Sequence, residues 1–429
     1  MFNKTYLFIL MLSCVDLSGQ SNYFENDINA IESKVIEWRR DFHQHPELGN
    51  QEFRTSEIIA KHLESLGFEV QKNVAYTGVV GILKGDKPGP VIALRADMDG
   101  LPVTERVNIP FKSEVKVEYA EQTTGVMHAC GHDSHMAILM GAAEVLAKHK
   151  NELAGTVKFI FQPAEEGVFG DGKAFGADLM VQEGVLKNPD VDVAFGLHIN
   201  SQTPAGHIKY KAGPIMAAVD QFYITVKGKQ THGAYPWSGI DPILVSSQII
   251  IGLNTIVSRS VNLIENPAVV SVGAINAGNR HNIIPEEAKF LGTIRTFDLE
   301  QRALVHGRIK EIAENIAKSA GAVAEVTIEN GYPVAFNNVA LTEKMLPSLQ
   351  RAAGEANTTE RNAVMGAEDF SYFAREVPGL FFFLGGMEKG KMPNEVAPHH
   401  TPDFYIDESG FKVGVQAFCN LVMDYMKME

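Results

Sequence analysis

Short apolar runs alternate with helical patterns in the first half of the chain. Four runs have the composition of buried strands: VVGILKG, PVIALRAD, GTVKFIFQP and VDVAFGLHI. From Ile28 to Leu66 the apolar spacing is helical and stops at Gly67. Between His135 and His149 apolar residues recur at the i, i+3, i+4, i+7 spacing of one helix face. Strands that alternate with helices predict an α/β domain with a mostly parallel sheet.

The pattern changes after Pro214. It then predicts, in order, the strand AVDQFYITVKGK, a helix in DPILVSSQIIIGLNTIVS, the strands PAVVSVGAINAG and EAKFLGTIRTF, a long helix from Leu299, and the strand AVAEVTIENGYPV. This βαββαβ order predicts a small ferredoxin-like α+β domain, in which helices cover one face of a four-stranded sheet. The later helix over 341–354, the strand LFFFLGG and a closing helix resemble the first domain. We therefore predict a catalytic domain made of residues 22–214 and 331–429, with a satellite domain, 215–330, inserted into it.

The first twenty residues, MFNKTYLFILMLSCVDLSGQ, have the pattern of a secretory signal peptide. Lys4 precedes a short apolar run from Tyr6 to Leu12, which is too short to span a bilayer. We expect residues 1–20 to be removed and the protein to be exported, either to a periplasm or outside the cell. Lipid anchoring through Cys14 is the alternative, but the three residues before Cys14 fit that pattern poorly. No later segment is apolar enough to predict a transmembrane span.

Composition narrows the range of ligands. The chain has 429 residues, 45% of them hydrophobic, and a formal net charge of −14 with no basic run. Because phosphate binding needs clustered positive charge, this charge argues against nucleic acid as a partner and leaves a small molecule open. After the predicted cleavage only Cys130 and Cys419 remain, so the protein is no disulfide scaffold.

Candidate chemistry gathers where predicted strands end. In open α/β sheets ligands bind beyond the carboxyl ends of the strands. Acids and a histidine follow three of these strands, and the segments HACGHDSH and PHHTPDF add a thiol and further imidazoles. The residues concerned are Asp97, Asp99, Cys130, His132, Glu165, Glu166, His198, His399 and His400.

Thiol, imidazole and carboxylate groups together suit Zn²⁺, with Mn²⁺, Co²⁺ or Ni²⁺ as alternatives. Two adjacent glutamates cannot easily ligate one ion in the same way, so one can bind metal while the other acts as a general base for hydrolysis. Each motif also has a plainer interpretation: a Glu-Glu pair is usually a solvated surface, and a histidine that ends a strand is usually structural. A Cys130 nucleophile with His128 or His132 as base is a further alternative, but it leaves the other groups without a role.

The motifs also occur in the order found in a known family. LRADMDGLP, HACGHD, FQPAEEG, GLH, GKQTHGAYP, HNIIPEEAKFLGTIRTF, MGAEDFSYF and HHTPDF resemble a family of dinuclear metal-dependent amidohydrolases. Its members include hippurate hydrolase, N-acyl-amino-acid amidohydrolases and the plant auxin–amino acid conjugate hydrolases, with carboxypeptidase G and aminoacylase as more distant relatives. The resemblance runs from about residue 30 to the C-terminus.

This resemblance implies two divalent metal ions, with Cys130 bridging them and Glu165 as the general base that later protonates the amine. It implies that His232 reaches the active site of a neighbouring subunit across the dimer, where it supports the tetrahedral oxyanion, and that Asn282 helps to hold the substrate. More distant relatives have a histidine at the position of Asp97, so Asp97 and Asp99 are expected to orient ligands instead. His400 matches the ligand position of the family better than His399. The implied metal ligands are Cys130, His132, Glu166, His198 and His400.

The sequence therefore predicts an exported hydrolase that cleaves the amide of an N-acylated amino acid and forms a homodimer through the satellite domain. The alternative within enzymes is a dipeptidase or carboxypeptidase that acts on a short peptide with the same apparatus. The alternative from another class is a protein that only binds metal or an acyl amino acid. Glu165 argues against the latter, because binding alone needs no base.

Overall fold

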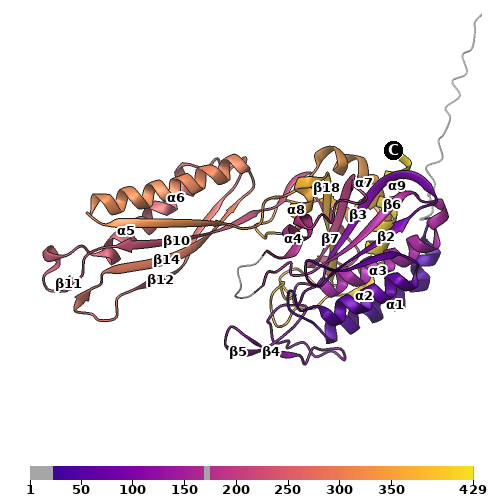
Figure 1. The fold of residues 1–429 in the computed structure, drawn as a ribbon, viewed down its shortest axis with the longest axis horizontal. Coiled ribbons are helices and arrows are strands. Elements are labelled where there is room, and N and C mark those ends of the chain that lie inside the picture. Colours follow the sequence, from indigo (N-terminus) through magenta and orange to yellow (C-terminus); the bar gives the residue numbers. More distant parts are fainter. Residues whose placement is uncertain (1–22, 169–173, 429) are drawn as a thin grey trace, which may run out of the picture.

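A twisted eight-stranded sheet forms the centre of the larger part of the molecule (Figure 1). The computed structural model describes residues 23–168 and 174–428; the predicted signal peptide and Cys14 lie outside them. In spatial order the strands are β1 (Glu69–Val74), β2 (Gly78–Lys84), β6 (Ala154–Gln162), β3 (Lys87–Asp97), β7 (Val193–Pro204), β18 (Gly379–Met387), β8 (Ile208–Tyr210) and β17 (Thr358–Glu360).

The four central strands, β6, β3, β7 and β18, run parallel to one another. Antiparallel pairing appears toward the edges, where β1 pairs with β2, β2 with β6, and β18 with β8. The prediction of a mostly parallel sheet is confirmed. Because parallel strands end at the same edge, the segments after β3 and β6 are brought together there.

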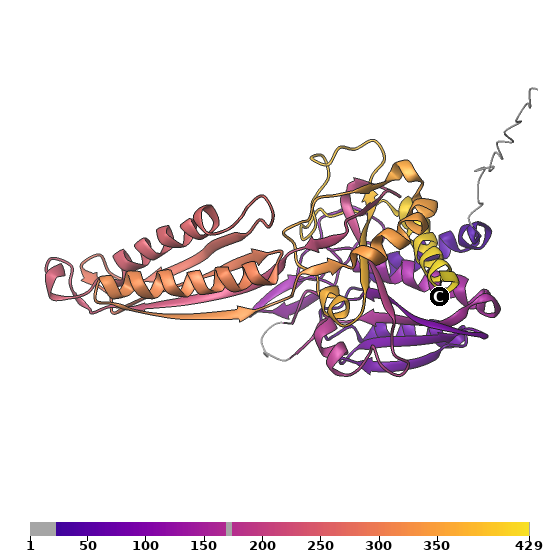
Figure 2. The same ribbon diagram turned by 90° about the horizontal axis from the view of Figure 1, so that it is seen from above.

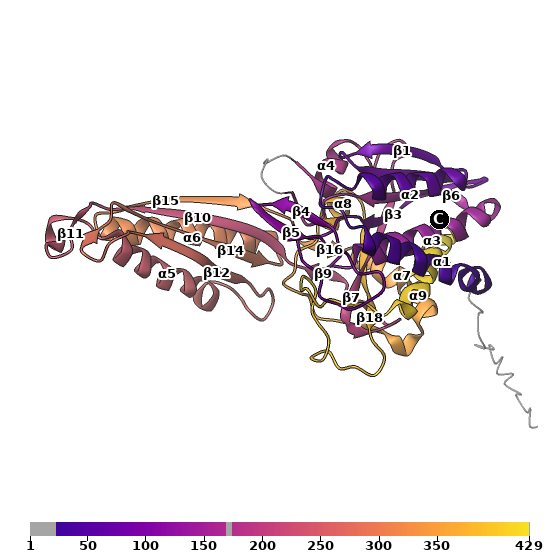
Figure 3. The same cartoon turned by 90° about the horizontal axis from the view of Figure 1, so that it is seen from below.

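Helices cover both faces of this sheet (Figure 3). In β18 alternate residues separate the two cores: Leu380, Phe382 and Leu384 face one cluster, and Phe381 and Phe383 face the other. The first cluster packs against α1 (Glu25–Gln44), α2 (Phe53–Ser65), α3 (His132–Lys148), α7 (Val339–Ala353) and α9 (Phe411–Met428). The second packs against α4 (Gly176–Gln182) and α8 (Phe370–Glu376).

The helical pattern predicted over residues 28–66 is divided into two helices. The helix α1 ends at Gln44, and α2 begins at Phe53. Pro46 follows the end of α1, and Asn50 has a φ of 61°, in the left-handed region. A proline lacks the backbone donor that a helix needs, and a left-handed residue cannot continue a right-handed helix. These two residues therefore explain the break.

The smaller part of the molecule is an elongated satellite domain (Figures 1 and 2). Its elements are β10 (Ala218–Lys227), α5 (Pro242–Arg259), β12 (Val269–Ala277), β14 (Glu287–Thr296), α6 (Leu299–Ser319) and β15 (Val323–Asn330). The four strands form an antiparallel sheet in the order β12-β14-β10-β15, and α5 and α6 pack on it around one core. The predicted βαββαβ arrangement is confirmed.

Short elements join the two parts. The strand β9 (Gly213–Met216) pairs with β16 (Ala335–Asn337) beside the main sheet, where the chain leaves for the satellite domain and returns from it. The exact boundaries at 214 and 330 stay predictions. The remaining elements are the hairpin β4 (Lys116–Tyr119) and β5 (Gln122–Gly125), the ribbon β11 (Thr231–His232) and β13 (Ile283–Ile284), and the 3₁₀ turns Lys150–Glu152, Pro236–Ser238, Glu355–Asn357 and Glu408–Gly410.

The helix α5 is apolar around much of its circumference. By length and composition alone it could cross a membrane, with a mean hydropathy of 1.2. Its Val245, Ile249 and Leu253 are buried in the satellite core, whereas Leu244 and Ile251 are 59% and 70% exposed. One apolar face of α5 therefore packs in the domain core, and the apolar residues on its opposite face are exposed to solvent in the single chain.

Candidate metal centre

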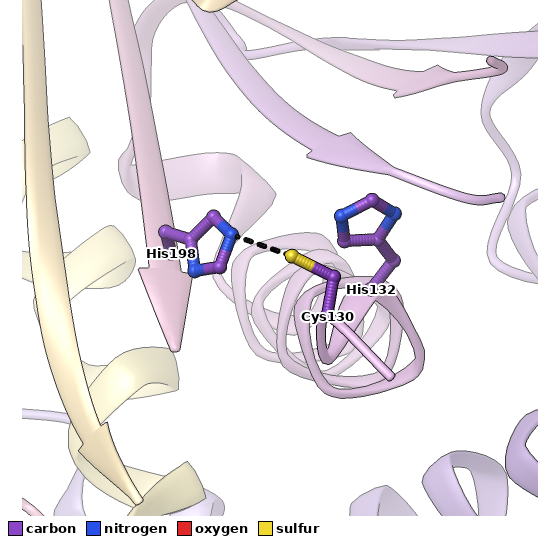
Figure 4. A group of neighbouring side chains, drawn as sticks. All are labelled: Cys130, His132 and His198. Carbon is purple, nitrogen blue, oxygen red and sulfur yellow. Dashed lines mark hydrogen bonds between the residues drawn. The ribbon is translucent and has the colours of Figure 1, made fainter. Parts of the chain in front are cut away.

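The sulfur of Cys130 lies at the centre of the predicted ligands. Two groups of possible ligand atoms share this sulfur: one consists of Cys130, His132 and His198, and the other of Cys130, Glu166 and His400. Within each group all ligand atoms lie within 4.8 Å of one another. The Nε2 atoms of His198 and His400 both lie 3.3 Å from the sulfur, and Figure 4 shows the first of these contacts. One thiolate between two triads is the arrangement expected of a bridging ligand.

Local backbone geometry aims these side chains. Gly131 precedes α3 with a φ of 100°, and a Cβ there would lie 2.3 Å from Cγ2 of Ile199. Glycine is therefore required between Cys130 and His132. His400 has a φ of 62°, and its backbone N–H donates to the carbonyl of Ala129 at 2.8 Å. This bond ties the C-terminal ligand to the segment that carries Cys130.

The ligand histidines have their Nδ1 atoms occupied by oxygen acceptors. His132 Nδ1 lies 2.9 Å from the carbonyl oxygen of Asp99 and 3.1 Å from its Oδ1, and His198 Nδ1 lies 2.5 Å from the carbonyl oxygen of Ile199. With Nδ1 donating, the Nε2 atom of each ring keeps a free lone pair, and that of His198 lies 3.3 Å from the sulfur of Cys130. His132 Nε2 is buried and has no hydrogen-bond partner among the described residues. A hydrogen bond on the far nitrogen is the usual way to fix the tautomer of a metal-ligating histidine.

Asp99 and Asp97 lie directly behind the ligands. Besides His132, the Asp99 carboxylate accepts the backbone N–H groups of Glu165 and Glu166, both at 3.0 Å. Asp97 Oδ1 lies 2.5 Å from Nδ1 of His135, and its Oδ2 lies 3.7 Å from Nε2 of His132. Asp99 thus holds one ligand ring and the backbone of the glutamate pair together. This is the geometry expected of the ligand-orienting role predicted for both aspartates.

The two adjacent histidines near the C-terminus have different surroundings. His399 Nδ1 lies 3.0 Å from the carbonyl oxygen of Cys130, and His399 Nε2 accepts the backbone N–H of Ser201 at 3.2 Å. Both of its ring nitrogens are therefore used by the backbone. His400 Nε2 lies 2.8 Å from Glu166 Oε1 and close to the Cys130 sulfur. The geometry favours His400 as the ligand, as the sequence predicted.

Glu165 is buried beside the two triads that share Cys130, but it is a member of neither. Its Oε2 lies 3.9 Å from His132 Nε2, and the hydroxyl of Tyr332 donates to its backbone carbonyl at 2.5 Å. Burial, together with the nearby carboxylates of Glu368 and Glu166, raises the pKa of Glu165 well above its ordinary value. A carboxyl group that can hold a proton near neutral pH is suited to general acid–base chemistry.

The sequence reasoning missed a buried charge network below Glu165. Arg95 donates from Nη1 to Asp97 and from Nη2 to Asp369, both at 2.8 Å, and its Nη2 lies 3.0 Å from Glu368. Gln162 connects Arg95 to Asp369 through further hydrogen bonds. The motif MGAEDFSYF contained the signal, since an acidic pair before an apolar helix start is unusual in a buried segment. Only the fold shows that its partner is Arg95.

The alternative of a cysteine nucleophile is not favoured by this geometry. Burial, with the carboxylates of Glu166 and Glu165 next in effect, raises the pKa of the Cys130 thiol well above its ordinary value. His128 is buried too, and burial lowers its pKa to about 4. Neither ring nitrogen of His128 has a hydrogen-bond partner among the described residues, so it does not activate the thiol. A nucleophilic cysteine needs the opposite, a lowered pKa and an adjacent base.

The donor set fits a pair of divalent ions. The buried His132 Nε2, which has no hydrogen-bond partner among the described residues, and the thiol placed among carboxylates are both unfavourable without a cation. A divalent cation would favour the thiolate and accept the imidazole lone pairs. Sulfur, nitrogen and carboxylate ligands suit Zn²⁺, Mn²⁺, Co²⁺ or Ni²⁺, and the geometry does not choose among them.

His232 and Asn282 are not brought to this centre within one chain. They lie near each other because β11 pairs with β13, with His232 opposite Ile283, at the end of the satellite domain far from the main sheet (Figure 1). His232 is exposed, and its Nδ1 accepts the backbone N–H of Ala234 at 3.0 Å. Their predicted roles in the active site therefore depend on a second subunit and stay predictions.

The profile of peptidase family M20/M25/M40 matches residues 93–424. The chain belongs to this family. Thermostable carboxypeptidase 2 of Saccharolobus solfataricus is 40% identical over 94% of this chain and 98% of its own length. N-acetylcysteine deacetylase of Bacillus subtilis is 39% identical over 92% of this chain and 97% of its own.

A solved structure of the same family agrees with the fold and with the metal centre. The YxeP protein of Bacillus subtilis, described as a dinuclear metal-binding peptidase of the M20 family, is 37% identical and superposes with a TM-score of 0.77, covering 94% of this chain and 100% of its own. The predicted resemblance to dinuclear metal-dependent amidohydrolases is confirmed. The protein is an M20-family hydrolase with a site for two metal ions.

Proposed function

We propose that this M20-family hydrolase cleaves the amide bond of N-acyl amino acids and releases a carboxylic acid and a free amino acid. The observation that carries the proposal is Glu165, a buried acid that stands beside two triads joined through Cys130. The deacetylase of Bacillus subtilis, named for an N-acetylated amino acid, is similar along nearly its whole length. An IAA-amino acid hydrolase of Arabidopsis thaliana is also 35% identical over 98% of this chain and 94% of its own.

The residues of the site divide the reaction between them. Two divalent ions, when bound by the ligands named above, supply polarisation of the amide carbonyl and acidification of water. Glu165 takes a proton from the attacking water and delivers it to the amide nitrogen, so that the amine can leave. Asp99 keeps the backbone of Glu165 and Glu166 and the ring of His132 in one arrangement throughout.

A pocket beside Glu166 is suited to an apolar acyl group. Its volume is about 670 Å³, and it is lined by the side chains of Leu48, Phe53, Tyr76, Leu101 and Tyr119 together with smaller residues. Among the described residues that line it there is no lysine, arginine or histidine, whereas Glu118 and Glu166 are present. An uncharged, apolar group is favoured there over an anion.

The proposal predicts hydrolysis of N-acyl amino acids by metal-loaded protein and none after chelation. We expect acetyl, benzoyl and indolylacetyl amino acids to be cleaved at rates that differ with the acyl group, because the pocket contacts that group. Release of free amino acid by the purified protein, loaded in turn with Zn²⁺, Mn²⁺, Co²⁺ or Ni²⁺, measures this. Unblocked dipeptides serve as the comparison. Faster cleavage of dipeptides than of every acyl amino acid would favour the peptidase alternative, which the carboxypeptidase relative supports.

We further propose that the active unit is a homodimer in which His232 of one subunit completes the site of the other. The exposed apolar face of α5, with Leu244 and Ile251, supports an interface on the satellite domain, and His232 cannot serve its own site from its observed position. Export after removal of residues 1–20 is a separate proposal, which N-terminal sequencing of the mature protein tests.

Mixed dimers test the role of His232. We expect His232→Ala to lower kcat by about 100-fold, the typical cost of removing one group that stabilises an oxyanion. Mixing this variant with Glu165→Gln should restore about a quarter of wild-type activity, because half of the dimers are mixed and each has one complete site. Activity of the mixture is measured after subunit exchange. A fully active monomer in light scattering, or no recovery in exchanged mixtures, would rule out the shared site.

A further inference from the structure

Arg361 is a half-buried cation with no carboxylate partner among the described residues, one layer of side chains from the metal centre. Its guanidinium carbon lies 4.2 Å from the centre of the Phe383 ring, which lies 6.0 Å from the ring of His198. Across residues 23–168 and 174–428 no acid forms an ion pair with it, and burial alone lowers its pKa. The buried Arg95, by contrast, has three carboxylates around it. An unpaired, partly desolvated charge is costly, which points to an anion that the described residues do not supply.

The fold holds Arg361 in this place. The backbone N–H of Arg361 donates to the carbonyl of Tyr210 at 2.9 Å, which continues the pairing of β17 with β8. Within the described part of the chain the guanidinium makes one weak bond, from Nε to the carbonyl of Asn362 at 3.3 Å, which leaves most of its donors without a protein acceptor there. The guanidinium of Arg361 lies over the face of the Phe383 ring, and this contact orients its N–H donors.

Phe383 connects Arg361 to the metal centre by strand register. Phe383 and His198 are partners in the parallel strands β18 and β7, so both side chains leave the sheet on the same face. On its other side Phe383 is opposite Lys209 of β8, whose ammonium donates to the Thr359 hydroxyl at 2.6 Å and forms no ion pair with a described residue. Among the described residues, Arg361 on the Phe383 ring and Lys209 opposite Phe383 in the sheet are thus two cations without acidic partners near the ligand His198.

We propose that Arg361 binds the free carboxylate of the amino-acid part of the substrate. This inference rests on the proposed function, because only a substrate with a free α-carboxylate needs such an anchor. None of the described residues that line the acyl pocket beside Glu166 is cationic, so we do not place the carboxylate there. The acyl group and the carboxylate would then lie on opposite sides of Cys130, toward Glu166 and toward His198 respectively.

The distances agree with a substrate of this size. The guanidinium carbon of Arg361 lies 4.2 Å from the ring centre of Phe383, which lies 6.0 Å from the ring centre of His198. The guanidinium carbon is therefore no more than about 10 Å from the ring centre of His198. A single residue between the scissile carbonyl and the carboxylate spans about 3.5 Å. A metal–oxygen bond of about 2 Å at the carbonyl end and a hydrogen bond of about 2.8 Å at the carboxylate end add to this length. The total is of the same order as the distance between the guanidinium of Arg361 and the ring of His198. An acyl amino acid can therefore contact both places at once.

Paired substrates separate anchoring from structural effects. N-acetyl-L-phenylalanine and its C-terminal amide differ only in the charge of the group that Arg361 would bind. For Arg361→Met we expect kcat/KM on the acid to fall about 100-fold, mainly through KM, with no change on the amide. Methionine preserves much of the contact with Phe383. Arg361→Lys should retain part of the preference, because an ammonium keeps the charge but loses the bidentate fork. Arg375→Met, at an exposed arginine of α8, is the matched control.

Binding gives a second readout. With the metal-loaded Glu165→Gln protein, calorimetry should show the acid binding about 100-fold more weakly when Arg361→Met is added, and the amide unchanged. Equal losses on acid and amide, in rate or in binding, would overturn the proposal. If the wild type cleaves no acyl amino acid but does cleave dipeptides, the proposed function fails while the same acid–amide comparison, made with a dipeptide and its amide, still decides the role of Arg361.

Discussion

Glu165→Gln should reduce turnover by about 1,000-fold or more while both metal ions stay bound. The substitution keeps the size of the side chain and removes only its ability to carry a proton, and general acid–base catalysis contributes about 10²–10⁴-fold. Metal binding should persist because both triads that contain Cys130 stay intact, although Glu165 also lies in a group with His132 and Glu166. The backbone N–H of Glu165 still reaches Asp99, so the arrangement of the neighbouring Glu166 is retained.

Two measurements on the same sample check this expectation. Metal content by elemental analysis should equal that of the wild type, and kcat on the best acyl amino acid should fall without a comparable rise in KM. Glu376→Gln, at an exposed glutamate of α8, is the control that should change neither. Unchanged turnover in Glu165→Gln would show that another group moves the proton. Loss of metal would show that Glu165 is a ligand.

Much of the site could be predicted because its chemistry is local in sequence. Asp97 and Glu165 each stand at or just after the end of a predicted strand. To place them side by side, one needs only the rule that parallel strands end at the same edge of a sheet. The choice of His400 over His399 came from the family motif and stays a prediction, which the hydrogen bonds of His399 with Cys130 and Ser201 favour. The satellite fold followed from its βαββαβ order.

Long-range pairing could not be predicted from the chain alone. The partners of Arg95 lie up to 274 positions away, and nothing in the segment LRAD indicates which carboxylates it will meet. Arg361 likewise becomes informative only when β17 pairs with β8 and places it on Phe383. The break between α1 and α2 was signalled by Pro46, but helical spacing on both sides of it concealed the interruption.

Cys130→Ser should abolish activity by loss of metal, which is a different failure from that of Glu165→Gln. The sulfur is the one atom that belongs to both the His132–His198 group and the Glu166–His400 group, so replacing it affects both ions together. A serine hydroxyl is far harder to deprotonate than a thiol, and a neutral hydroxyl is a poor bridge between two cations. We expect the metal content to fall below one ion per chain and kcat/KM to fall at least 1,000-fold.

The other cysteine supplies the matched control for this prediction. Cys419 is buried in α9, away from the two triads, and Cys419→Ser should keep two ions per chain and most of the activity despite some loss of stability. If Cys130→Ser retained two ions, the thiolate would not be the bridge, and the shared position would have to be occupied by a carboxylate such as Asp97. The ratio of bound metal to protein in these two variants therefore decides whether one sulfur joins the two halves of the site.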